Sequence, residues 1–120
     1  MKKFPLWEAV AGVFVGVAIV SAFLLAPTEF LMGDVQRIFY FHVPTAWIAF
    51  LAYFLVFCFS IAYLVTRNGA WDRRSLAAAE VGTLFCTIVL VTGPLWAKPV
   101  WGIWWTWDAR LTLTAILLLI

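Results

Sequence analysis

The sequence predicts an all-α, polytopic transmembrane helix bundle with three complete spans, the start of a fourth and a tryptophan-rich amphipathic segment on the outer side. Two observations lead to this fold class. Of the 120 residues, 66% are hydrophobic and only 12% are charged, so a water-soluble fold would lack a polar surface. The apolar residues also form long blocks with few charges, and about 20 such residues carry a helix across a bilayer.

The first predicted span covers residues 10–26 and follows Lys2 and Lys3. This apolar run is longer than the core of a signal peptide, which has about 7 to 15 residues. Pro27 would also stand directly after the most plausible cleavage point. We therefore expect a helix that is retained in the mature protein.

The second and third predicted spans cover residues 43–65 and 76–95. The second carries no charged residue, and Pro44 suits the first turn of a helix. The third carries Glu80 near its start and is expected to end at the Gly-Pro pair at 93–94.

A fourth apolar run begins near Leu111 and is about half the length of a span when it stops at Ile120. We therefore expect residues 1–120 to be a single membrane domain that forms the N-terminal part of a longer protein, with a C-terminal truncation.

The distribution of Lys and Arg predicts the orientation of these spans. Lys2 and Lys3 precede the first span, and Arg67, Arg73 and Arg74 lie between the second and third. Short connections rich in Lys and Arg stay on the cytoplasmic side. We therefore expect a multi-pass protein of the cell inner membrane with a cytoplasmic N-terminus. Arg73 or Arg74 is also expected to pair with the glutamate of the third span.

The connections at 27–42 and 96–110 then face the periplasm. The first of them holds Asp34 and Arg37, three residues apart, for which a surface ion pair is expected.

Several classes of function are disfavoured by the residues themselves. The basic residues form no cluster beyond two adjacent arginines, so nucleic-acid binding is not expected. Cys58 and Cys86 lie inside apolar blocks and form neither CxxC nor CxxCH, so both are predicted to pack in the core. His42 is the only histidine, so this chain cannot supply a cage of several histidines to a metal.

Five of the eight tryptophans lie within the twelve residues from Trp96 to Trp107. If this stretch were helical, Trp101, Trp104, Trp105 and Asp108 would form one face. Such a surface beside Lys98 and Arg110 suits a large, flat, anionic ligand such as a porphyrin with propionates. The alternative is an interfacial anchor, because tryptophan prefers the headgroup level of a membrane.

His42 and Asp108 each occupy the predicted start of a helix. The positive end of the helix dipole favours neutral imidazole, the form that binds metal, so His42 suits an iron ligand, although a histidine there can also be an interface residue. Asp108 is expected to cap the fourth helix and to hold Arg110 in place.

The segment WGIWWTWDARLT, residues 101–112, resembles the WWD signature of haem-handling membrane proteins. The segments VTGPLWAKPVWG and RIFYFHVPTAW are similar to the heme exporter protein C (CcmC) family in particular, and the resemblance runs from about residue 26 onward. It implies a cytochrome c assembly domain that delivers haem at the outer face of the cytoplasmic membrane, a carrier without catalytic residues. The implied partners are the haem chaperone CcmE, the transporter subunits CcmA and CcmB, the small protein CcmD and the lipid bilayer.

The resemblance also implies the residues of the haem site. His42 would be an axial ligand of the iron of a b-type haem that is held non-covalently and transiently, and the second ligand would lie outside this chain. The other residues implied to contact haem are Trp96, Trp101, Trp104, Trp105, Trp107, Asp108 and Arg110. Two further hypotheses remain open at this point: a haem b electron-transfer subunit and a structural anchor subunit of a membrane complex.

Overall fold

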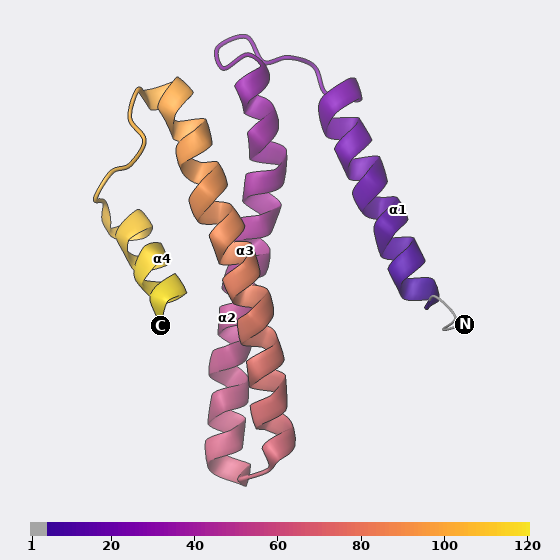
Figure 1. Cartoon of the computed structure of the whole chain (residues 1–120), viewed down its shortest axis with the longest axis vertical. Helices are drawn as coiled ribbons and strands as arrows, with labels where there is room; N and C mark the ends of the chain where they lie inside the picture. The colour runs from indigo at the N-terminus through magenta and orange to yellow at the C-terminus, as the bar shows by residue number, and fades with distance from the viewer. Residues whose placement is uncertain (1–4) are drawn as a thin grey trace. The chain divides into compact units, whose positions relative to one another are not determined.

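A computed structural model describes residues 5–120 of the chain as a series of helices joined by short connections (Figure 1). No strand forms within these residues. The contacts divide the chain into two compact units, one ending at Arg37 and the other spanning Ile38–Ile120. The elements in order are α1 (Leu6–Val20), a π-helical turn (Ser21–Leu25), a 3-10 helix (Asp34–Ile38), α2 (Phe39–Thr66), α3 (Gly69–Trp101) and α4 (Ala109–Leu119).

Three helical segments are long and apolar enough to cross a membrane, namely Leu6–Leu25, Asp34–Thr66 and Gly69–Trp101. Large apolar side chains stay exposed along all three of them, as expected for surfaces that face lipid. The predicted all-α fold with three spans and a shorter fourth helix is therefore confirmed. Lys2 and Lys3, on which part of the predicted orientation depends, lie outside the described residues.

Arg37 forms hydrogen bonds and an ion pair within the first unit. Its guanidinium donates to the carbonyl oxygens of Ala22, at 3.3 Å, and of Phe23, at the end of the first span where helix carbonyls lack partners. Its Nε lies 3.2 Å from Oδ1 of Asp34, which confirms the predicted ion pair. The Arg37 side chain is only 19% exposed, so these contacts also organise the connection between the first span and the 3-10 helix.

The helices α2 and α3 form an antiparallel hairpin (Figure 1). Its turn consists of Arg67, whose backbone adopts the left-handed conformation with φ of 53°, and Asn68. The Arg67 N–H donates to the carbonyl of Tyr63 at 2.8 Å, and the Asn68 side chain accepts from the N–H of Ala70 at 2.9 Å. These bonds satisfy backbone groups at the end of α2 and the start of α3.

Small side chains allow the two helices of this hairpin to approach closely. Ala49 and Ala52 of α2 and Gly82 and Cys86 of α3 are buried. Helix contacts in membranes depend on such small residues, because lipid supplies no hydrophobic drive for association. The prediction that Cys86 packs in the core is confirmed, since its side chain is 1% exposed, whereas Cys58 is half-buried.

Pro44 and Pro94 both lie deeper inside their helices than the sequence predicts. α2 begins at Phe39, so Pro44 lies in its second turn rather than its first. α3 continues through Pro94 and Pro99 to Trp101, so the predicted end at residues 93–94 is wrong. A proline interrupts only one backbone hydrogen bond, and membrane helices tolerate that loss where neighbouring groups compensate.

The expected ion pair of Glu80 does not form among the described residues. Glu80 is exposed, and the Arg74 guanidinium instead lies over the ring of Trp71, 4.6 Å from its centroid. This arrangement is a cation–π contact at the turn of the hairpin.

Candidate functional site

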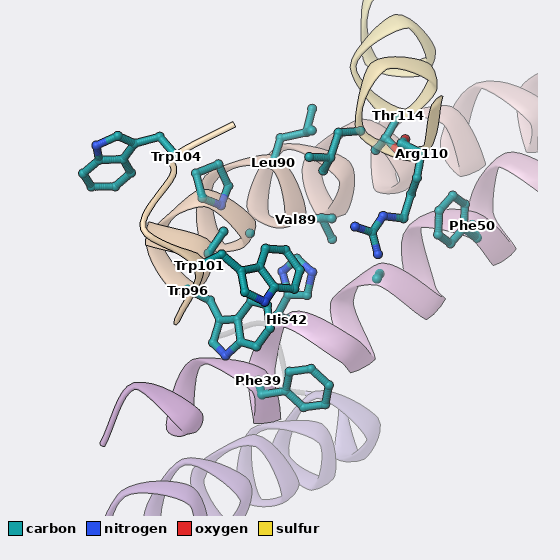
Figure 2. Close-up of a pocket in the computed structure, with 15 residues that line it drawn as sticks. Phe39, His42, Phe50, Val89, Leu90, Trp96, Trp101, Trp104, Arg110 and Thr114 are labelled. Atoms are coloured by element: carbon teal, nitrogen blue, oxygen red, sulfur yellow. Dashed lines mark hydrogen bonds between the residues drawn. The ribbon is translucent and has the colours of Figure 1, made fainter. Parts of the chain in front are cut away.

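A cavity of about 410 Å³ opens at the end of the hairpin opposite to the Arg67-Asn68 turn. It lies between the start of α2, the last turns of α3 and the first turns of α4 (Figure 2). Its volume is in the range of about 300 to 1,000 Å³ that small-molecule sites occupy. The residues that matter for its chemistry are Phe39, His42, Trp96, Trp101, Trp104 and Arg110.

His42 lines this cavity from the first turn of α2. The helix begins at Phe39, three residues before His42, whereas the sequence predicted a start after His42. The imidazole is half-buried, and its Nδ1 lies 2.8 Å from Oγ1 of Thr92 on α3. The ring also lies against the α3 backbone, where a Cβ on Gly93 would stand 3.3 Å from the Cε1 atom of His42. Because Nδ1 is bonded to Thr92, Nε2 is the nitrogen left to meet a ligand.

Aromatic rings form one wall of the cavity beside His42 (Figure 2). The Trp96 and Trp101 rings meet edge to face with centroids 4.9 Å apart, and Phe39 lies 5.9 Å from Trp96. Such packing fixes the orientation of large flat side chains. The Nε1 atom of Trp96 is buried and finds no hydrogen-bond partner among the described residues. A buried N–H of this kind favours an acceptor on whatever fills the cavity.

Arg110 supplies a cation to the cavity from the start of α4 (Figure 2). Its Nε lies 3.9 Å from Oδ1 of Asp108, and its side chain is 70% exposed. The predicted proximity of these two residues is confirmed. A loose ion pair at an exposed position contributes little energy, so the guanidinium keeps its capacity to bind an anionic group.

Asp108 caps α4, as the sequence predicts. Its Oδ1 accepts from the N–H of Leu111 at 3.0 Å, and Oδ2 accepts from the Thr106 hydroxyl. The Thr106 hydrogen bond, followed by the Leu111 N–H, lowers the pKa of the Asp108 carboxyl below its ordinary value. Asp108 does not line the cavity, so its part in the site is to fix where the helix that carries Arg110 begins.

The tryptophan-rich segment is not the helix that its spacing suggested. α3 ends at Trp101 because Gly102 adopts φ of 79°, and the Gly102 N–H donates to the Lys98 carbonyl at 2.9 Å. Residues 103–108 then run without helical structure to the cap of α4. The predicted continuous face of Trp101, Trp104, Trp105 and Asp108 is therefore wrong.

The cavity brings together five of the eight residues predicted for the site. Trp105 and Trp107 lie outside it and contact each other edge to face at 5.9 Å. Lys98, expected beside the tryptophans as a cation for the ligand, instead donates from Nζ to the Gly102 carbonyl at 2.8 Å, with Nζ 6.0 Å from the Trp104 ring centroid. The predicted site residues that line the cavity are His42, Trp96, Trp101, Trp104 and Arg110.

Three residues of the site were missed by sequence reasoning. Phe39 lies three residues before His42, which places both on one face of a helix, but the predicted helix began too late for this spacing to be used. Thr92 and Gly93 belong to the segment VTGP, whose proline was interpreted as the end of a helix. Thr92 and Gly93 contact the histidine ring only because α2 and α3 pack together, and no local sequence pattern reveals that packing.

The fold and the site together define a polytopic membrane protein with an aromatic pocket, one imidazole and one guanidinium at one end of a helical hairpin. The chain belongs to the heme exporter protein C (CcmC) family, whose model matches residues 1–120.

Individual relatives agree with this family. Heme exporter protein C of Haemophilus influenzae is 39% identical over 97% of this chain and 47% of its own length. Heme exporter protein C of Escherichia coli K12 is 39% identical over 93% and 46%. A Marchantia polymorpha protein named as ccmC-like, mitochondrial and of cytochrome c biosynthesis is 43% identical over 86% and 45%. The chain therefore spans about half the length of the curated relatives it matches.

Proposed function

We propose that this chain handles haem at the outer face of the cytoplasmic membrane and delivers it for cytochrome c biogenesis. The observation that carries the proposal is the meeting of His42, the aromatic wall and Arg110 in one cavity. Membership of the heme exporter protein C family supports the same cargo.

The residues of the cavity fit a haem group chemically. An imidazole nitrogen is a common axial ligand of haem iron, and bound haem supplies an iron with axial positions open to such a nitrogen. Trp96 and Trp101 offer apolar faces and edges to a flat ring, while Arg110 suits the carboxylate of a propionate.

The mode of binding that we propose is non-covalent and transient, as for a b-type haem. Neither cysteine lies in a CxxCH sequence, and neither lines this cavity. This chain offers one histidine to the iron, so a second axial ligand would come from elsewhere.

The hairpin supports a specific orientation in the inner membrane. Its turn contains Arg67, while Arg73 and Arg74 follow in the first turns of α3, and the cavity lies at the other end. Arginine-rich connections favour the cytoplasm, so the cavity would face the periplasm. We further propose that residues 1–120 are the N-terminal part of a cytochrome c assembly domain.

Delivery requires an acceptor, and we propose the haem chaperone CcmE, as the resemblance in sequence implies. We further propose assembly with the transporter subunits CcmA and CcmB and with the small protein CcmD. Within this scheme the chain acts as a carrier, because the cavity offers an imidazole for iron, aromatic rings and a cation, which are groups for binding.

The test is the visible absorption spectrum of the protein purified from membranes in detergent, comparing wild type with His42→Gly. Trp47→Phe serves as the control, since Trp47 is an exposed aromatic of α2 that does not line the cavity. We expect a histidine-type haem spectrum in wild type and control, its loss in the His42 variant and its partial return with added imidazole. An unchanged spectrum in His42→Gly would show that the iron is bound elsewhere.

A further inference from the structure

We propose that Thr92 is a positioning residue that holds His42 in the tautomer protonated at Nδ1, so that Nε2 is the nitrogen presented to the iron. This inference deepens the proposed function and rests on it for the identity of the metal. The tautomer itself is a property of the protein without haem and can be measured without it.

The Thr92 hydroxyl has a single proton and therefore one hydrogen bond to donate. Its Oγ1 lies 2.8 Å from the carbonyl oxygen of Ile88, one helical turn earlier, and 2.8 Å from Nδ1 of His42. A hydroxyl donates one hydrogen bond and accepts up to two. If its proton goes to the Ile88 carbonyl, Oγ1 can only accept from His42, and Nδ1 must carry a proton.

Other threonines of this chain show that the bond to the preceding turn is the ordinary one. The hydroxyls of Thr66, Thr87 and Thr114 each donate to the carbonyl four residues earlier, at 2.7 to 2.8 Å. This bond is the local preference of threonine within a helix. Thr92 therefore adopts the same arrangement as threonines that have no histidine beside them, and its lone pair is left for the imidazole.

The opposite arrangement has a defined chemical consequence. If the Thr92 hydroxyl donated to Nδ1, the neutral imidazole would carry its proton on Nε2. A protonated ring nitrogen has no lone pair for a metal, and Nδ1 would be occupied by the hydroxyl. His42 would then present no ligand to the cavity, so the direction of this one hydrogen bond decides whether the site can bind iron.

Gly93 completes the support of the ring. Its lack of a side chain allows the Cε1 edge of His42 to approach the backbone of α3. Thr92 therefore fixes one ring nitrogen, and Gly93 gives the adjacent carbon its place, both from a single turn of α3. Partners of this kind orient metal-binding histidines and raise their basicity, and their removal typically costs about 10- to 100-fold in metal affinity.

The first experiment is ¹⁵N NMR of the haem-free chain labelled at histidine, in detergent micelles at about pH 8, where an imidazole with an ordinary pKa is neutral. The chain contains one histidine, so its ring signals need no assignment by mutation. We expect a pyrrole-type signal at Nδ1 and a pyridine-type signal at Nε2. A pyrrole-type signal at Nε2 in wild type would overturn the inference, whether or not the protein binds haem.

The second experiment compares Thr92→Val with Thr92→Ser, and uses Thr87→Val as the matched control. Thr87 makes the same bond to the preceding turn but is exposed and does not line the cavity, so it reports the general cost of losing a threonine hydroxyl from α3. We expect Thr92→Val to shift the tautomer toward Nε2–H and to weaken haem binding about 10- to 100-fold. Thr92→Ser and Thr87→Val should retain both the wild-type tautomer and the wild-type affinity.

The outcomes separate this inference from the proposed function. If Thr92→Val weakens haem binding while its tautomer stays as in wild type, Thr92 acts through packing and the inference is wrong. If wild type binds haem through His42 but Thr92→Val changes neither readout, the inference falls and the proposed function stands. If the tautomer responds as expected but no variant and no wild-type protein binds haem, the positioning role of Thr92 stands and the proposed function falls.

Discussion

Gly93 and His42 lie so close that a Cβ on the glycine would stand 3.3 Å from the Cε1 atom of the imidazole. At that separation the ring would have to move by a few tenths of an ångström. A shift of the ring away from α3 would lengthen the 2.8 Å contact between His42 and Thr92. The identity of residue 93 on α3 is thus linked to the position of a side chain on α2.

Gly93→Ala should therefore weaken haem binding, measured by titration with haem and absorption spectroscopy, by about tenfold. Gly82→Ala is the control, because its Cβ would meet Ala52 and Tyr53 at an ordinary distance of 3.4 Å. Both changes bring the same gain in helix propensity. An alanine before Pro94 also conflicts with the proline ring, and Pro94 itself lines the cavity. Comparing Gly93→Ala/Pro94→Ala with Pro94→Ala alone therefore isolates the contact with His42. Equal affinity in these two variants would show that the imidazole tolerates the extra methyl group.

Trp101 and Trp107 should respond differently to the same substitution. Trp101 lines the cavity and meets Trp96 edge to face, whereas Trp107 is 83% exposed and lies outside it. Replacing Trp101 with Leu should cost about 0.5 to 1.5 kcal/mol of aromatic interaction, or roughly two- to tenfold in haem affinity. Trp107→Leu should leave that affinity unchanged in the same titration. Equal losses in the two variants would indicate that the whole segment contacts the ligand.

The cap of α4 should depend on pH in one direction. Hydrogen bonds from Thr106 and the Leu111 N–H lower the pKa of Asp108 from its ordinary value of 3.8. A carboxyl with a lowered pKa stabilises the folded state above its ordinary pKa, and the contribution is lost as the pH falls through the lower folded value. Amide exchange of Leu111 should therefore stay slow at neutral pH and accelerate only below about pH 4, relative to the intrinsic rate.

Two variants separate the cap of Asp108 from its charge. Asp108→Asn keeps an oxygen that can accept from the Leu111 amide but lacks the charge, as the protonated carboxyl does, so at neutral pH it should give the reduced protection that wild type shows below about pH 4. Asp108→Ala removes the acceptor and should lose that protection at every pH. If Asp108→Asn behaved like Asp108→Ala, the charge rather than the hydrogen bond would hold the start of α4.

Arg67→Gly should stabilise the hairpin. Arg67 adopts the left-handed conformation with φ of 53°, which costs a residue with a Cβ roughly 1 to 2 kcal/mol and costs glycine little. Glycine is the common residue at this point of a helix end. Because glycine is also more flexible when unfolded, we expect a net gain of about 0.5 to 1 kcal/mol in thermal or denaturant unfolding in detergent. Arg67→Ala should show no such gain, which separates the backbone effect from the loss of charge.

The spans were predictable from the sequence because bilayer crossing imposes a length and a composition on a continuous stretch of chain. The ends of the helices were less predictable. Pro94 and Pro99 lie inside α3, since a single missing N–H is tolerated where a helix is already held by its neighbours. A rule derived from isolated helices therefore placed the end of this span too early.

The shape of the tryptophan-rich segment could not be read from its spacing. The positions of Trp101, Trp104 and Trp105 fit a helical face, but Gly102 adopts φ of 79° and ends α3 before that face can form. Hydrophobic spacing alone cannot distinguish a helix from an irregular segment of the same composition. Arg110 and His42 were predicted as site residues, and the structure places both at one cavity, while Thr92 depends on contacts between helices and stayed hidden.

The two helix caps that flank the tryptophan-rich segment have a consequence for how strongly a ligand can be held. Gly102 closes α3 and Asp108 opens α4, so the five residues between them are a short tether with both ends anchored. Such a tether has lost much of its conformational freedom already in the ligand-free protein. The affinity of the site for a ligand then depends partly on two helix caps that do not contact the ligand. A substitution that loosens either cap would increase the entropy lost on binding and so weaken binding.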